Sequence, residues 1–258
     1  MILKVDEVLF SYINIGNIQL PNRIVVSPMC QYSAHDGLMN DWHLQHLTQM
    51  GFSGAGLIMI ESTAVEEIGR ITNYCVGLYN KDCENSIKTT LDRVRKLSLP
   101  STKFGIQLGH AGRKGSTQRP WEGRLYLKNN EAPWETCAPS PIPFDSGWHV
   151  PIELTYKDMN RIKEAFVKAS VRASKIGFDL IEIHGAHGYL LHQFLSPISN
   201  KRQDEYGGSL ENRMRFPLEV FQAVKDANKD LPIGMRITGT EWEKGGFEIE
   251  DSIIFLVN

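Results

Sequence analysis

The chain has 258 residues, a formal net charge of −2, 41% hydrophobic residues and 22% charged residues. This composition is typical of a globular protein with a buried core, and it argues against partners that need a basic surface, such as nucleic acid or an anionic membrane. No uncharged stretch approaches the length of a membrane span, and the 4 cysteines show no C-x-x-C spacing, so we expect reduced thiols in a cytoplasmic protein.

Apolar runs of strand length alternate with amphipathic helices along the chain. The predicted strands span residues 23–29, 56–62, 103–110, 178–184 and 232–238. An apolar stripe at helical spacing predicts a helix with Thr155 and Asp158 as its cap and Gly177 as its end. Another stripe at positions 87, 91 and 94 predicts a shorter helix. A further helix should begin at Ser209 and be kinked or interrupted at Pro217.

Alternating strands and helices predict a parallel sheet, either doubly wound or closed as a (β/α)8 TIM barrel. Polar residues end several strands (Cys30, Ser62, His110 and His184), and a barrel carries its active site at that end. Only about the first five barrel strands are countable, and the last residues resemble the opening turns of a helix. We therefore expect one barrel domain over 1–258, incomplete at its C-terminal end, with a lid-like loop excursion over 116–155.

The stretch after the fourth predicted strand carries the clearest chemistry. Glu182 and His184 share one face of the strand, and a glycine-containing turn then brings in His187 and Tyr189. Two imidazole N–H groups can grip one substrate oxygen, while a neutral phenol donates a proton to a nearby carbon. A zinc site using these histidines or the His43/His46 pair lacks a marked third ligand, and a satisfied buried histidine is the simplest alternative.

Four segments together resemble the Old Yellow Enzyme family of FMN-dependent ene-reductases, in the branch of thermophilic-like and xenobiotic reductases. They read SPMCQYS, IQLGHAGRKGS, IEIHGAHGYLLHQFLSPISNKRQDEYGGSLENR and GMRIT. The resemblance implies a (β/α)8 barrel with non-covalent FMN and NAD(P)H as hydride donor. The substrate would be an activated alkene, an α,β-unsaturated carbonyl or nitro compound. It also implies a homodimer or homotetramer of the complete protein.

The resemblance further implies a role for each matching residue. Residues expected to contact the flavin are Ser27, Pro28, Met29, Cys30, Ser62, Gln107 and Arg236. Gln107 would bond the pyrimidine edge, and Arg236 would face N1 and O2, where negative charge collects on reduction. Substrate would meet Tyr32, His184, His187 and Tyr189, with the two histidines holding its oxygen and Tyr189 donating the proton. The loop carrying Arg113 and Lys114 approaches the cofactor in this family.

In this fold, loops after strands seven and eight hold the flavin phosphate. Those residues should lie beyond Asn258, so we expect this chain by itself to bind FMN poorly and to be marginally folded. Three alternatives remain open: the flavin barrel of a larger dienoyl-CoA, aryl-CoA or amine oxidoreductase, a metal-dependent hydrolase using Glu182, His184 and His187, and an inactive truncated barrel.

Overall fold

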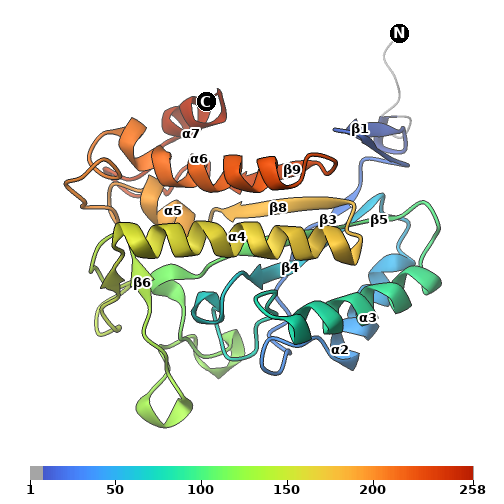
Figure 1. Cartoon of the computed structure of the whole chain (residues 1–258), viewed down its shortest axis with the longest axis horizontal. Helices are drawn as coiled ribbons and strands as arrows, with labels where there is room; N and C mark the ends of the chain where they lie inside the picture. The colour runs from blue at the N-terminus through green and yellow to red at the C-terminus, as the bar shows by residue number, and fades with distance from the viewer. Residues whose placement is uncertain (1–7, 258) are drawn as a thin grey trace.

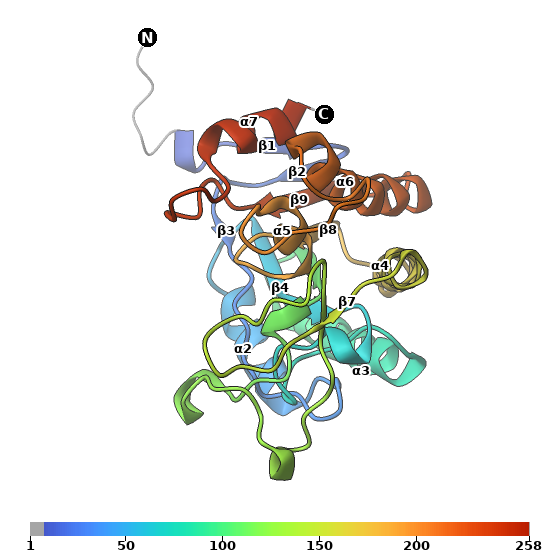
Figure 2. The same cartoon turned by 90° about the vertical axis from the view of Figure 1, so that its left-hand side faces the viewer.

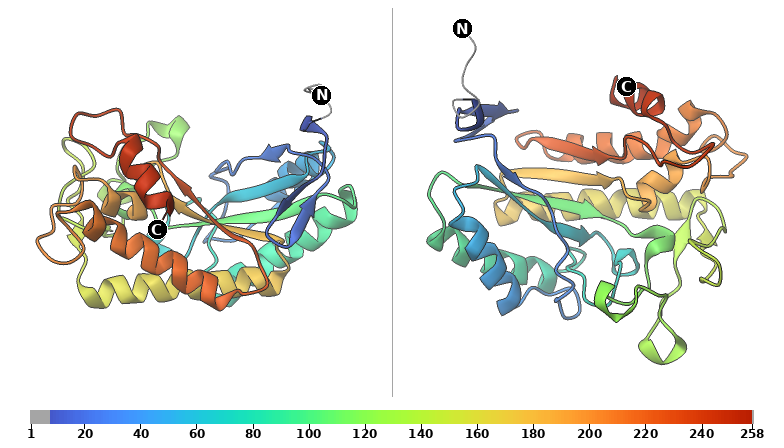
Figure 3. Two further views of the ribbon diagram at one scale, coloured as in Figure 1. Left: turned by 90° about the horizontal axis from the view of Figure 1, so that it is seen from above. Right: turned by 180° about the vertical axis from the view of Figure 1, so that it is seen from behind.

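A five-stranded sheet organises the computed structural model, which describes residues 8–257 (Figure 1). Its strands are β3 (Val25–Val26), β4 (Leu57–Ala64), β5 (Lys103–Gly109), β8 (Leu180–Gly185) and β9 (Ile233–Ile237). Every neighbouring pair is parallel, and the spatial order follows the chain without reversal. A doubly wound sheet reverses its order at a switch point. The curled sheet therefore resembles part of a barrel (Figure 3).

Helices cover one face of this sheet and leave the other face open. The connecting helices are α2 (Asp41–Gly51), α3 (Lys81–Leu97), α4 (Tyr156–Ile176) and α6 (Leu210–Ala227). Helices α3, α4 and α6 lie in front of the strands in Figure 1, and the strands lie in front in the reverse view of Figure 3. Right-handed crossovers between sequential parallel strands place all such helices on the same side. The main core lies in this layer, where Ile106, Ile181 and Ile183 pack with Phe166.

Local sequence signals explain how the helices begin and end. Thr155 caps α4 in a reciprocal capping box with Asp158, and Gly177 ends the helix in the left-handed conformation, as predicted. Helix α6 begins after Ser209, whose hydroxyl accepts the N–H of Asn212 at 3.3 Å. Of the two outcomes expected at Pro217, an interruption is wrong, because α6 continues through it, and a kink stays a prediction. Burial of Pro217 and neighbouring residues against the core offsets the missing hydrogen bond.

Two short features escape prediction by periodicity. The first predicted strand shrinks to β3, because Pro28 has no N–H to donate to a neighbour. Before it, β1 (Ile13–Ile15) and β2 (Ile18–Leu20) form an antiparallel hairpin that packs against Leu57, Met59 and Leu180. Because Leu57 and Leu180 begin their strands, the hairpin covers the N-terminal end of the sheet, opposite the strand ends that carry the polar residues.

The excursion over 116–155 lies at the C-terminal end of the strands (Figures 1 and 2). It holds two short 3-10 helices, η3 (Pro120–Glu122) and η4 (Asn129–Glu131), and the parallel pair β6 (Cys137–Ala138) and β7 (Ile152–Glu153). The remaining elements are η1 (Glu67–Gly69), η2 (Gly112–Lys114), α5 (Leu190–Leu195) and α7 (Ile249–Val257). Across residues 8–257, none of the helices combines the length and apolarity needed to cross a bilayer.

Candidate active site

Neighbouring strands place the predicted polar residues side by side at one end of the sheet. Register pairs Gln107 with Glu182 and His184 with Arg236. Along β8 the isoleucines enter the helix-side core. Since side chains alternate along a strand, Glu182 and His184 face the open side. The sheet thus collects one amide, one carboxylate, one imidazole and one guanidinium on its open face.

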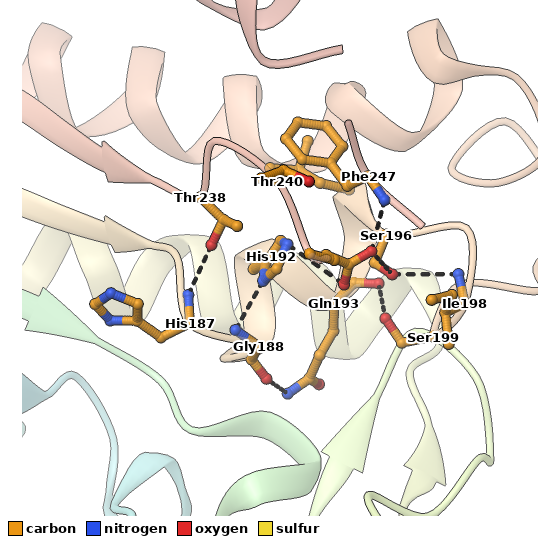
Figure 4. Close-up of polar contacts among 12 residues, drawn as sticks. His187, Gly188, His192, Gln193, Ser196, Ile198, Ser199, Thr238, Thr240 and Phe247 are labelled. Carbon is orange, nitrogen blue, oxygen red and sulfur yellow. Dashed lines mark hydrogen bonds and ion pairs between the residues drawn. The ribbon is translucent and has the colours of Figure 1, made fainter. Parts of the chain in front are cut away.

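The turn between β8 and α5 is held by hydrogen bonds from several elements (Figure 4). His187 and Gly188 adopt φ of 59° and 73°, which lets the chain reverse within three residues. The His187 N–H donates to Thr238 Oγ1 at 3.0 Å, and the Gly188 N–H donates to His192 Nδ1 at 2.7 Å. Gln193 Nε2 donates to the Gly188 carbonyl at 2.8 Å. The His187 ring points away from this network, so it is left available for a ligand.

This turn brings three aromatic polar side chains together. The rings of His184 and His187 lie 5.1 Å apart, and those of His184 and Tyr189 lie 4.9 Å apart, both edge to face. Burial is the main cause that lowers the pKa of His184 to about 3, with a further contribution from neighbouring cations. Its Nδ1 accepts the Ala186 N–H at 3.3 Å, so the neutral ring carries its proton on Nε2. Burial also raises the pKa of Tyr189 far above its ordinary value, so both groups are neutral proton carriers near pH 7.

A polar floor lies one layer deeper on the open face. Gln107 is buried, and its Nε2 donates to Glu182 Oε1 at 2.7 Å. This bond fixes the amide so that its Oε1 remains an acceptor. Burial raises the pKa of Glu182, while Gln107 and Arg236 act in the opposite direction. The Arg236 side chain makes no hydrogen bond or ion pair with any of residues 8–257. The floor therefore offers one free acceptor, Gln107 Oε1, and one cation, Arg236, whose N–H groups are not engaged by residues 8–257.

The opposite wall is formed by the segment after β3 and the end of β4. Ser27 and Met29 are exposed, whereas Pro28 and Cys30 are half-buried. The thiol of Cys30 lies beside Ser62 and Tyr32, and burial raises its pKa well above the ordinary value. Gly109 lies between Ser62 and His184: a Cβ there would stand 2.7 Å from Ser62 Oγ and 3.3 Å from His184 Cβ. Because Ser62 and Gly109 are small, no large side chain projects from this part of the open face.

The excursion contributes one wall of a cavity of about 220 Å³ above the site. Tyr32 lines it from the segment after β3 and Tyr189 from the start of α5, while Arg124, Phe144 and Trp148 line it from the excursion. Trp121 packs edge-on against Tyr32 at 6.1 Å. Trp134, a second tryptophan of the excursion, donates to the Ile68 carbonyl at 3.0 Å and stacks under Arg70.

A buried acid–histidine pair supports the segment after β3, and sequence reasoning missed it. Glu61 Oε2 accepts the Gln31 N–H at 3.0 Å, and Glu61 Oε1 lies 3.5 Å from His43 Nε2. Burial raises the pKa of Glu61 to about 8 and lowers that of His43 to about 4. A carboxylate inside the apolar run 56–62 was the available signal. Within the described part of the chain, no three His, Cys, Asp or Glu side chains are grouped as metal ligands.

Comparison with known proteins places this chain in a family. The model of the NADH:flavin oxidoreductase / NADH oxidase family matches residues 8–258. An NADPH dehydrogenase of Listeria innocua is 42% identical over 249 residues, covering 96% of this chain and 68% of that protein.

Solved structures agree with this match. Morphinone reductase superposes with a TM-score of 0.80 at 28% identity, covering 95% of this chain and 66% of its own. Old Yellow Enzyme from Pichia also superposes with a TM-score of 0.80 at 27% identity, covering 94% and 62%. The chain thus spans about two thirds of the length of these relatives.

Proposed function

Because this chain belongs to the NADH:flavin oxidoreductase / NADH oxidase family, with FMN as cofactor and NAD(P)H as hydride donor, we propose that the complete protein is an ene-reductase. It would reduce the C=C bond of α,β-unsaturated carbonyl or nitro compounds. The sheet β3-β4-β5-β8-β9 would supply the first five strands of a (β/α)8 barrel. The single observation that carries the proposal is the cluster of His184, His187 and Tyr189 beside the polar floor.

The residues of the open face fit a flavin ring. Arg236 makes no hydrogen bond or ion pair with residues 8–257, and its charge acts on Glu182 only through space. A flavin that gains electrons concentrates negative charge where such a cation stabilises it. The free Oε1 of Gln107 would accept an N–H of the pyrimidine edge. Ser62 and Gly109 leave room for a flat ring, and residues 27–30 would contact its edge. When bound, FMN supplies the hydride transfer that no side chain can perform.

The chain's own residues would hold the substrate and complete the reaction. His184 Nε2–H and the exposed His187 ring would donate to the carbonyl or nitro oxygen, polarising the conjugated alkene as negative charge develops there. Because the pKa of Tyr189 is raised, its hydroxyl keeps a proton and would deliver it to the carbon next to the activating group. Tyr32, with Trp121 against it, would close the substrate side.

The visible spectrum of the FMN-loaded complete protein tests this function. NAD(P)H should bleach the flavin band under anaerobic conditions, and 2-cyclohexenone should restore it with formation of cyclohexanone. A bleached flavin that only oxygen reoxidises would reject the ene-reductase assignment. The same spectrum of residues 1–258 alone tests whether the phosphate site must come from further residues.

The proposal extends to the state of the protein in the cell. Cys30, Cys75, Cys83 and Cys137 all carry free thiols, which favours a cytoplasmic protein. A homodimer or homotetramer is expected for the complete protein, and light scattering after size-exclusion chromatography measures it.

A further inference from the structure

The cavity above Tyr189 carries positive charge without an acidic partner. Its lining residues are Tyr32, Ile71, Thr72, Lys114, Thr117, Gln118, Pro120, Arg124, Phe144, Trp148 and Tyr189. Two of these side chains are cations and none is a carboxylate. Arg113, the cation next to Lys114 in the chain, is directed to the carbonyls of Ile142 and Pro143 at 3.2 and 3.1 Å.

Lys114 is held in place at the floor of this cavity. Its ammonium donates to the His187 carbonyl at 2.8 Å and lies 4.8 Å and 4.9 Å from the ring centres of Tyr189 and Phe144. Burial, with the neighbouring charges of Arg113 and Arg124, lowers the pKa of Lys114 to about 8. No carboxylate of the described chain forms an ion pair with it. An anion in the cavity would stabilise the charged form of Lys114, because it would replace the hydration lost on burial and offset the repulsion from Arg113 and Arg124.

Arg124 stands at the mouth of the same cavity. It is exposed, it adopts a φ of 60°, and its side chain makes no hydrogen bond or ion pair with residues 8–257. Its positive charge lowers the pKa of each of three neighbours, Tyr32, Tyr189 and Lys114. A guanidinium that is not engaged by the protein is a ready bidentate partner for a carboxylate.

We propose that Lys114 and Arg124 form an anion subsite that selects alkenes bearing a carboxylate beyond the reacting C=C bond. The inference rests on the proposed function, since it places that bond next to Tyr189. An aromatic wall of Phe144 and Trp148 would pack on the carbon skeleton while the carboxylate meets the two cations. The phosphates of NADPH are the other anions that could meet the two cations. Measuring flavin reduction by NADPH and flavin reoxidation by the alkene separately distinguishes the two ligands.

The test compares 4-oxo-2-pentenoate with its methyl ester in the FMN-loaded complete protein. The two compounds share the same enone, and only one carries a charge. Stopped-flow reoxidation of the reduced flavin gives an apparent second-order rate constant for each. The variants are Lys114→Gln, whose amide can still donate to the His187 carbonyl, and Arg124→Gln. Matched controls are Lys96→Gln and Arg93→Gln, which are exposed on α3.

The measured quantity is the acid-to-ester ratio of rate constants relative to wild type, so the intrinsic reactivity of each compound cancels. We expect each site variant to lower this ratio about tenfold, the loss typical of one hydrogen bond to a charged group. Added salt should lower the ratio in wild type and have less effect in the variants. The two controls should leave it unchanged. An unchanged ratio in both site variants, with the ester still reduced, would overturn the subsite while leaving the proposed function standing.

Two further measurements resolve the remaining outcomes. If the variants slow flavin reduction by NADPH but not by NADH and leave the acid-to-ester ratio intact, the cations serve the coenzyme phosphate and the substrate assignment is wrong. Binding of saturated 4-oxopentanoate, followed by tryptophan fluorescence with Trp148 in the cavity, needs no turnover. Weaker binding of 4-oxopentanoate in Arg124→Gln than in wild type supports the subsite. This holds even if wild type fails to reduce the ester, because that failure would reject the ene-reductase assignment and not the subsite. Equal binding in wild type and Arg124→Gln contradicts it.

Discussion

Replacing Tyr189 by phenylalanine removes one hydroxyl and keeps every packing contact of the ring. That hydroxyl makes no hydrogen bond with residues 8–257, while the ring packs 4.9 Å from His184 and 4.8 Å from the Lys114 ammonium. No buried partner is left unsatisfied by the change. We therefore expect the free energy of unfolding to stay within about 0.5 kcal/mol of wild type.

The same change should have a large effect on the reaction. Loss of a positioned proton donor typically slows the affected step by about 10²–10⁴-fold, or about 2.7–5.4 kcal/mol at 1.36 kcal/mol per tenfold. We expect an effect within this range, because Tyr189 keeps its proton near pH 7 and its ring lies 4.9 Å from His184, in the turn assigned to the substrate. Flavin reduction by NAD(P)H needs no such proton donor and should be unaffected.

Anaerobic stopped-flow on the two half-reactions checks this reasoning in the FMN-loaded complete protein. Tyr32→Phe is the matched control, since Tyr32 lines the same cavity and is assigned to closing the substrate side, not to proton transfer. The expected pattern is slow alkene-driven reoxidation in Tyr189→Phe, a small change in Tyr32→Phe, and normal reduction in both. Unimpaired reoxidation in Tyr189→Phe would refute its role, and a large loss in Tyr32→Phe would transfer that role to Tyr32.

Three further predictions concern the floor, the buried acid and the core. Arg236→Gln should lower the two-electron flavin potential by roughly 30–60 mV, the equivalent of losing one charged hydrogen bond; dye-coupled redox titration measures it, and an unchanged potential would place Arg236 away from the flavin. The folded-state pKa of Glu61 is about 8 against an ordinary 4.5, so the folded state binds its proton more tightly, and stability is lost as the pH rises through about 8. Urea unfolding should therefore show that the free energy of unfolding of Glu61→Gln, relative to that of wild type, rises by on the order of 4 kcal/mol from pH 5 to pH 9. If the two proteins instead show parallel pH profiles, Glu61 is ionised when folded. Phe166→Ala should lower the free energy of unfolding by about 3–5 kcal/mol, because the ring is fully buried in the main core; a loss below about 1 kcal/mol would mean that the core collapses around the gap.

Local sequence determined most of the secondary structure and one part of the site. The capping box at Thr155 and the stop at Gly177 bound α4 because both signals act within one helical turn. His184, His187 and Tyr189 lie within six residues, so the glycine turn alone could bring them together. Local rules could not decide whether α6 continues through Pro217, where packing outweighed a lost hydrogen bond. They also missed the β1–β2 hairpin, whose strands are too short to show a period.

Only the tertiary structure decided features that depend on residues far apart in the chain. The sequential strand order distinguished a barrel-like sheet from a doubly wound one, which the apolar runs could not do. The orientation of the Gln107 amide came from Glu182, 75 positions away, and the cavity from Tyr32, Lys114, Trp148 and Tyr189. The proton on Glu61 and the neutral ring of His184 follow from burial. Burial is a property of everything that packs around a group, so no local pattern of residues can specify it.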